Sequence, residues 1–190
     1  MFALRFHTPD DWTQIVMEHF DRFLVDHAAA EKKASGMAIS MLSHYPDRPE
    51  LVRTMADLAV EEMNHFREVI KLMLARGLQP TPDEKDPYVN QLRKAMRKGS
   101  DPYLLDRLLV GGVIEARGCE RFGLVAEALE PGPLRDFYAA ITTSESRHRE
   151  VFVDLAKCYF DTDAVTGRLH QLLDIEAEIV SRLPLRAALH

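Results

Sequence analysis

Two copies of the pattern Glu-x-x-His constrain the fold of this 190-residue chain more than any other feature. One copy is Glu62-Met-Asn-His65, and the other is Glu145-Ser-Arg-His148. Residues three positions apart on an α-helix lie side by side on one face, so each copy presents a carboxylate and an imidazole to the same point. The pattern therefore predicts two helices that each carry a pair of metal-binding side chains.

A single acid precedes each copy, and both acids stand inside an apolar pattern of helical spacing. Glu31 precedes the first copy and Glu115 precedes the second, at nearly equal distances along the chain. The order Glu, then Glu-x-x-His, is therefore repeated. This order is the ligand pattern of carboxylate-bridged dinuclear metal sites in ferritin-like four-helix bundles. The predicted metal ligands are Glu31, Glu62, His65, Glu115, Glu145 and His148.

The alternative explanation is four solvated glutamates and two histidines in an ordinary core. One Glu-x-x-His arises easily by chance on an exposed helix, but two copies with matched upstream acids are much harder to obtain. The four acids also stand among apolar residues, where a carboxylate without a cation would be costly or would take up a proton. Four carboxylates and two imidazoles suit two iron or manganese ions better than a soft metal.

The spacing of apolar residues predicts an all-α fold, a ferritin-like four-helix bundle formed by one domain over residues 1–190. A short helix is expected in the long connection between the second and third long helices, and a fifth helix at the C-terminal end. The expected helices run from Thr8 to His44, from about Asp47 to Arg76, from Pro87 to Lys98, from Ser100 towards Glu130, from Leu134 to Phe160, and from after Asp163 to Pro184.

Three glycines stand inside the predicted third long helix, at positions 111, 112 and 118. Glycine lowers the stability of a helix interior by about 1 kcal/mol relative to alanine. These glycines therefore indicate either close packing or a cavity beside the metal. Four alanines near Glu31, at positions 28 to 30 and 34, would also leave room there, although high helix propensity explains them equally well.

The composition excludes several classes of protein. The net charge of −6 gives no global basic field that would attract nucleic acid or an acidic membrane. Cys119 and Cys158 form no C-x-x-C motif, so a cysteine-ligated zinc or rubredoxin-type iron site is not expected. Neither a signal pattern nor an apolar run long enough to cross a bilayer is present. We therefore expect a cytoplasmic protein that does not bind membranes.

One dense basic patch interrupts this acidic chain, and it consists of Arg93, Lys94, Arg97 and Lys98. Such a patch is usually an ordinary solvated helix face. It would gain a role only if the substrate were anionic.

Three strings of the chain resemble a known family. They are Glu31-Lys-Lys-Ala34, the segment from Leu109 to Phe122, and Ser144-Glu-Ser-Arg-His148. They resemble the MiaE-type tRNA-modifying di-iron monooxygenases, over about residues 10 to 180. The string from Ile114 to Phe122 is the specific part, because the Glu-x-x-His pairs occur in many ferritin-like families.

This resemblance implies O2-dependent hydroxylation of the isopentenyl group of 2-methylthio-N6-isopentenyladenosine, next to the tRNA anticodon. It implies the same six residues as ligands of two iron ions, with O2 as co-substrate. It also implies that the protein binds tRNA and an electron-transfer partner. The expected assembly is a monomer or a small oligomer. A tRNA substrate would give the basic patch a role, because phosphate contacts come from lysine and arginine.

Two other functions remain open at this point. The string Glu62-Met63-Asn-His65 also resembles the Glu-Met-x-His string of bacterioferritins, in which the methionine binds haem between subunits. Iron oxidation and storage in a large cage would then be the function. A rubrerythrin-like peroxidase is a further alternative, weakened by the missing C-x-x-C iron domain.

Overall fold

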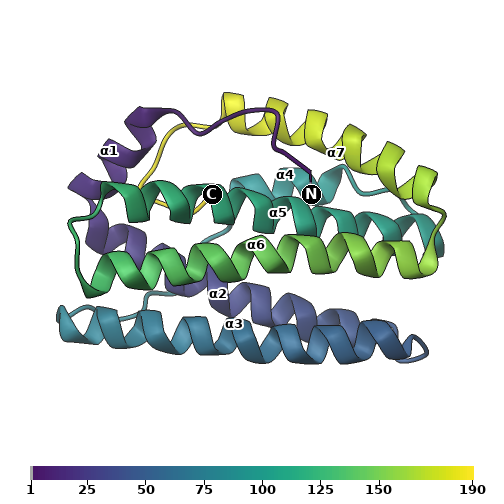
Figure 1. Ribbon diagram of the computed structural model, residues 1–190, viewed down its shortest axis with the longest axis horizontal. Helices are drawn as coiled ribbons and strands as arrows, with labels where there is room; N and C mark the ends of the chain where they lie inside the picture. The colour runs from purple at the N-terminus through teal and green to yellow at the C-terminus, as the bar shows by residue number, and fades with distance from the viewer. Residues whose placement is uncertain (1) are drawn as a thin grey trace. The chain divides into compact units, whose positions relative to one another are not determined.

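The computed structural model describes residues 2–190, and within that range the chain folds into seven α-helices and no β-strand (Figure 1). The expected all-α class is confirmed. None of the helices in the described range is long and apolar enough to cross a membrane. The helices are α1 Asp10–Glu18, α2 Phe20–His44, α3 Pro49–Ala75, α4 Pro87–Lys94, α5 Ser100–Ala128, α6 Pro133–Tyr159 and α7 Thr162–Arg182.

The chain divides into two compact units. The α2–α3 unit contains Gln14–Glu84 and Arg186–Leu189. The α4–α7 unit contains the chain up to Thr13, Lys85–Leu185 and His190. Each unit contains one pair of long helices joined by a short connection, and each is described separately below.

In the α2–α3 unit the two long helices pack as an antiparallel hairpin. The Ser35 hydroxyl donates a hydrogen bond of 2.8 Å to the Ala59 carbonyl, and Arg76 Nε donates one of 2.8 Å to Asp21 Oδ1. These two contacts fix the register of the hairpin. At the end of α3, Gly77 has a φ of +74°, which glycine adopts without steric cost, so the predicted helix stop is confirmed.

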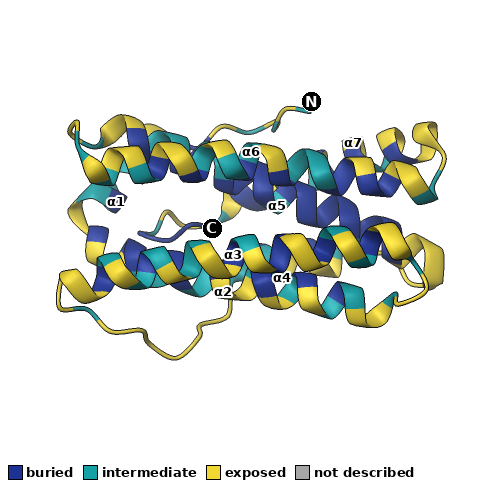
Figure 2. Cartoon of the chain, turned by 60° about the horizontal axis from the view of Figure 1, so that its bottom comes forward, coloured by how far each residue is buried: buried dark blue, intermediate teal, exposed yellow. Residues whose placement is uncertain are grey.

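In the α4–α7 unit, α5 and α6 form the second antiparallel pair, and α7 packs against α4, α5 and α6. Most of α5 is buried (Figure 2). This explains its apolar run from Leu108 to Val113, since a helix covered on several sides needs apolar residues around most of its circumference.

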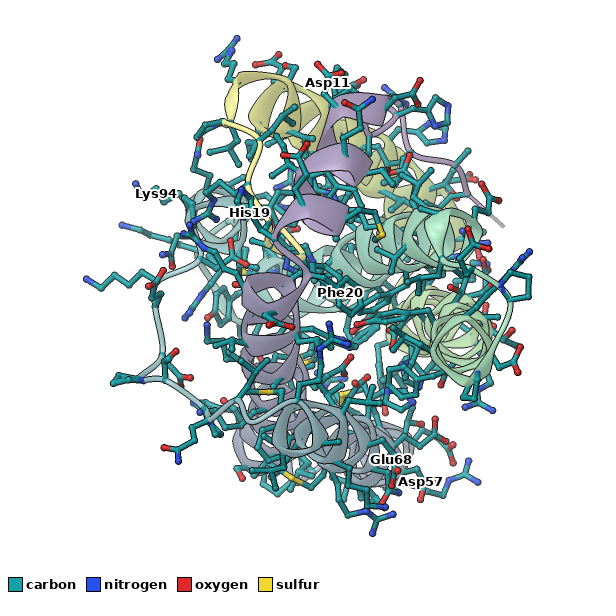
Figure 3. The ribbon with its side chains drawn as sticks, turned by 90° about the vertical axis from the view of Figure 1, so that its left-hand side faces the viewer. Asp11, His19, Phe20, Asp57, Glu68 and Lys94 are labelled. Carbon is teal, nitrogen blue, oxygen red and sulfur yellow. The ribbon has the colours of Figure 1, made fainter. Side chains whose placement is uncertain are left out.

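The first predicted helix, from Thr8 to His44, is interrupted. Helix α1 ends at Glu18 and α2 begins at Phe20, with His19 between them at φ −125° and ψ 41°. The chain changes direction at this point (Figure 3). No proline or glycine stands nearby, so the sequence contains no ordinary signal for the break.

The short fourth helix also ends earlier than predicted, at Lys94 rather than Lys98. Arg97 and Lys98 therefore lie in the connection to α5, and Gly99, with φ +101°, is the N-cap instead of Ser100. The reason is a tertiary contact, because both the backbone N–H and the guanidinium of Arg97 donate hydrogen bonds to Asp106, at 2.7 and 2.8 Å. Arg168 from α7 donates to the same fully buried carboxylate at 2.8 Å.

The glycines of α5 allow close packing against α6. A Cβ atom at Gly111 would lie 2.7 Å from the Phe152 ring, and one at Gly112 would lie 3.1 Å from the Arg149 carbonyl oxygen. At positions 111 and 112 the glycines therefore allow close packing and do not mark a cavity. At Gly118 an added Cβ would meet only Phe122, at 3.8 Å.

This packing predicts opposite effects for two glycine substitutions. Gly111→Ala should lower the free energy of unfolding by about 1–3 kcal/mol, because the added methyl group overlaps the Phe152 ring. Gly36→Ala, at an exposed position of α2 with nothing within 4 Å, should raise it by up to about 1 kcal/mol through helix propensity. Urea unfolding of both variants checks this, and a neutral Gly111→Ala would contradict the packing.

Candidate metal centre

The α2–α3 hairpin brings the first three predicted ligands together. Glu31 on α2 lies opposite Glu62 and His65 on α3, as the register set by Ser35 and Ala59 requires. His65 Nδ1 is 3.6 Å from Glu31 Oε2 and 3.5 Å from Glu62 Oε2. One donor atom from each residue lies within 4.8 Å of the other two. Both carboxylates are buried, whereas the His65 side chain is 16% exposed.

The α5–α6 pair brings the other three predicted ligands together. Glu115 lies on α5, and Glu145 and His148 lie on α6. His148 Nδ1 is 3.3 Å from Glu145 Oε2, and donor atoms of all three residues lie within 4.8 Å of one another. All three side chains are buried. Each helical pair thus carries one half-site of two carboxylates and one imidazole.

The charges of the first half-site attract a cation. Burial works to lower the pKa of His65, but the hydrogen bonds and charges of Glu31 and Glu62 outweigh it and raise that pKa to about 10. The two carboxylates therefore favour positive charge at the position of His65. Buried carboxylate oxygens beside imidazole nitrogens are the donor set of iron and manganese sites, so both half-sites fit such an ion.

His27 contacts the first half-site, and sequence reasoning assigned it no role. It is fully buried, and its Nε2 lies 2.6 Å from Glu31 Oε1. The available signal was its position four residues before Glu31, which places both side chains on the same face of α2. In the second half-site, the Ser144 hydroxyl lies 3.4 Å from His148 Nε2.

Glu120, five residues after Glu115 on α5, takes part in a different cluster. It accepts a hydrogen bond of 2.7 Å from the Thr8 hydroxyl and forms an ion pair with Arg117. Arg117 is fully buried and also donates to Glu176 of α7 at 2.8 Å and to the Phe6 carbonyl at 2.8 Å. These contacts attach the N-terminal segment and α7 to α5, so Glu120 has a structural role.

The four basic residues do not form one equivalent group. Arg93, Lys94 and Lys98 are exposed, and Figure 3 shows Lys94 at the surface. Arg97 is exposed too, but its guanidinium is bound to the buried Asp106. Three of the four side chains therefore remain available to bind phosphates.

Comparisons with known proteins show which family the chain resembles. The family model described as tRNA-(MS[2]IO[6]A)-hydroxylase (MiaE) matches residues 2–190. Two curated relatives are named tRNA 2-(methylsulfanyl)-N(6)-isopentenyladenosine(37) hydroxylase. The protein from Pseudomonas putida is 33% identical over 91% of this chain and 84% of its own length. The protein from Salmonella typhimurium is 30% identical over 82% of this chain and 56% of its own length.

A solved structure, protein 43 with aldehyde deformylating oxygenase activity from Synechococcus, has the same fold. It superposes with a TM-score of 0.91 and 33% identity, covering 98% of this chain and 93% of that chain. The expected ferritin-like fold is thus confirmed, and the fold and the buried Glu and His clusters together fit the binding of iron. From the match over nearly its whole length, the chain belongs to the MiaE family of tRNA hydroxylases.

Proposed function

We propose that this chain is an O2-dependent di-iron monooxygenase that hydroxylates the isopentenyl group of 2-methylthio-N6-isopentenyladenosine in tRNA. The observation that carries the proposal is the pair of buried Glu, Glu and His clusters in a chain that matches the family from residue 2 to residue 190. A tRNA substrate also implies that the enzyme works in the cytoplasm.

The six predicted ligands would together hold two iron ions, as the repeated Glu and Glu-x-x-His pattern does in ferritin-like proteins. A reduced di-iron centre supplies the activation of O2 that hydroxylation of a C–H bond requires, and its electrons come from an external donor. The chain's own contribution is to bury the carboxylates and to hold them at fixed positions. The apolar ring of Phe152, which is fully buried, fills the space beside Gly111, one turn before Glu115.

Binding of tRNA would depend on a local patch, because the net charge of −6 repels phosphates overall. All four residues of the basic patch are exposed, but Arg97 is bound to Asp106, so we assign the phosphate contacts to Arg93, Lys94 and Lys98. Arg97 was expected to belong to the same group. Its binding to Asp106 gives it a structural role in addition, so a test of tRNA binding must leave it unchanged.

Metal loading is the first test of this proposal. Protein loaded anaerobically with Fe2+ should contain about two irons per chain. Glu115→Ala and His148→Ala should each reduce binding at one or both metals, as measured by elemental analysis and iron spectroscopy. Glu127→Gln, an exposed acid on the same helix α5, is the control and should keep both irons. Two irons with unchanged spectra in both ligand variants would refute the assignment.

Replacement of Arg93, Lys94 and Lys98 by Gln tests the basic patch. The triple variant should raise the KM for tRNA and make it less dependent on salt. The slope of log affinity against log salt concentration should become shallower by about 0.7–0.9 for each phosphate that these side chains neutralise in the wild type. Activity on the isolated modified nucleoside should change little. Arg97→Gln, in contrast, should lower stability through Asp106. An equal decrease of activity on tRNA and on the nucleoside would mean that the three residues do not bind tRNA.

The fate of oxygen separates hydroxylation from iron storage. With 18O2 the label should appear in the product hydroxyl of an isopentenyladenosine-containing tRNA. Ala34→Leu, which fills partly exposed space one turn after Glu31, should keep two irons but lower the yield of product per O2 consumed. Label found only in water, together with iron mineralised inside a cage, would support the storage alternative instead.

A further inference from the structure

The two carboxylate oxygens of Glu31 lie against two different histidines. Oε1 is 2.6 Å from His27 Nε2, and Oε2 is 3.6 Å from Nδ1 of the predicted ligand His65. His27 is fully buried, and Glu31 is only 3% exposed. One oxygen of Glu31 therefore contacts His27 of the same helix, and the other lies on the side of His65, a predicted ligand of the same half-site.

The direction of this hydrogen bond follows from the chemistry of its partners. A carboxylate that binds iron is ionised and has no proton to donate, so in the iron-bound site His27 Nε2 would donate to Glu31 Oε1. A short hydrogen bond to a charged group in a buried position is stronger than a bond between neutral groups in water. Both side chains are on the same helix, one turn apart. Movements of one helix relative to another therefore do not separate them.

The second half-site is different at the corresponding position. The residue four positions before Glu115 is Gly111, which has no side chain, and the space beside it is filled by the Phe152 ring at less than 3 Å from the Cβ position. An imidazole cannot occupy that place. The two half-sites thus share the order of their ligands but differ in what stands one turn before the upstream glutamate.

We propose that His27 is a positioning residue that holds Oε1 of Glu31, so that Glu31 presents Oε2 alone to iron. This makes the iron position bound by Glu31 different from the one bound by Glu115. The inference rests on the proposed di-iron function. The competing explanation is a core histidine that only fills space, since its ring also lies 6.0 Å from the Phe23 ring.

Two substitutions of His27 separate the hydrogen bond from the packing. His27→Leu fills a similar volume with an apolar side chain and removes the donor. His27→Gln keeps an N–H donor at a similar distance from the backbone. We expect His27→Leu to weaken binding at one of the two irons about 10–100-fold and to change the Mössbauer signal of that iron alone. His27→Gln should retain most of the wild-type affinity and both signals.

Ser35→Ala is the matched control. Ser35 is buried one turn after Glu31 on the same helix, and its hydroxyl binds the Ala59 carbonyl rather than a predicted ligand. Its removal should cost stability, seen in the unfolding of the iron-free protein, without changing either iron. Iron titration and Mössbauer spectra of the four whole proteins, wild type included, provide the comparison.

Three results would overturn the inference. One is wild-type affinity and spectra in His27→Leu, and another is an equal loss of iron in His27→Leu and His27→Gln. The third is a loss in Ser35→Ala as large as that in His27→Leu. If His27→Leu does not fold, His27→Asn, whose shorter side chain cannot reach Glu31, takes its place against His27→Gln. Wild-type protein that binds no iron would instead refute the proposed di-iron function, and the inference with it.

Discussion

The burial of four carboxylates is the constraint on which this structure depends. Glu31, Glu62, Glu115 and Glu145 are each less than a tenth exposed, and such burial is unfavourable unless positive charge compensates it. The structure concentrates donors around them, with His65 and His148 three residues after the paired acids and His27 one turn before Glu31. The long helices and their close contacts serve to hold these groups away from water.

The string from Ile114 to Phe122, which carries the family resemblance, has two roles. Glu115 lies in the second half-site, whereas Arg117 and Arg121 lie in a buried polar cluster on another face of α5. Arg117 binds Glu176 and the N-terminal segment, and Arg121 lies over the Trp12 ring at 4.9 Å. This string therefore combines a predicted ligand with structural residues, whereas the Glu-x-x-His pairs contain predicted ligands alone.

The sequence predicted the Glu-x-x-His pair of each half-site because that pair depends on local geometry. Helical spacing places Glu62 beside His65 and Glu145 beside His148 whatever surrounds them, and Gly77 marks the end of α3 through its own backbone preference. Features that depend on distant contacts were not predictable. The break at His19, the early end of α4 and the role of Arg97 have no local signal, since Arg97 is held by Asp106 and shares it with Arg168. Close packing at Gly111 became distinguishable from a cavity only once Phe152 was located.

The central claim is that this chain hydroxylates a modified adenosine of tRNA, and mass analysis of tRNA nucleosides tests it most directly. Total tRNA from cells with the protein should contain the hydroxylated form of 2-methylthio-N6-isopentenyladenosine. Cells without the protein should contain the unhydroxylated form in its place, and a variant lacking a predicted ligand should not restore the hydroxyl group. An unchanged amount of the hydroxylated nucleoside in cells without the protein would contradict the account.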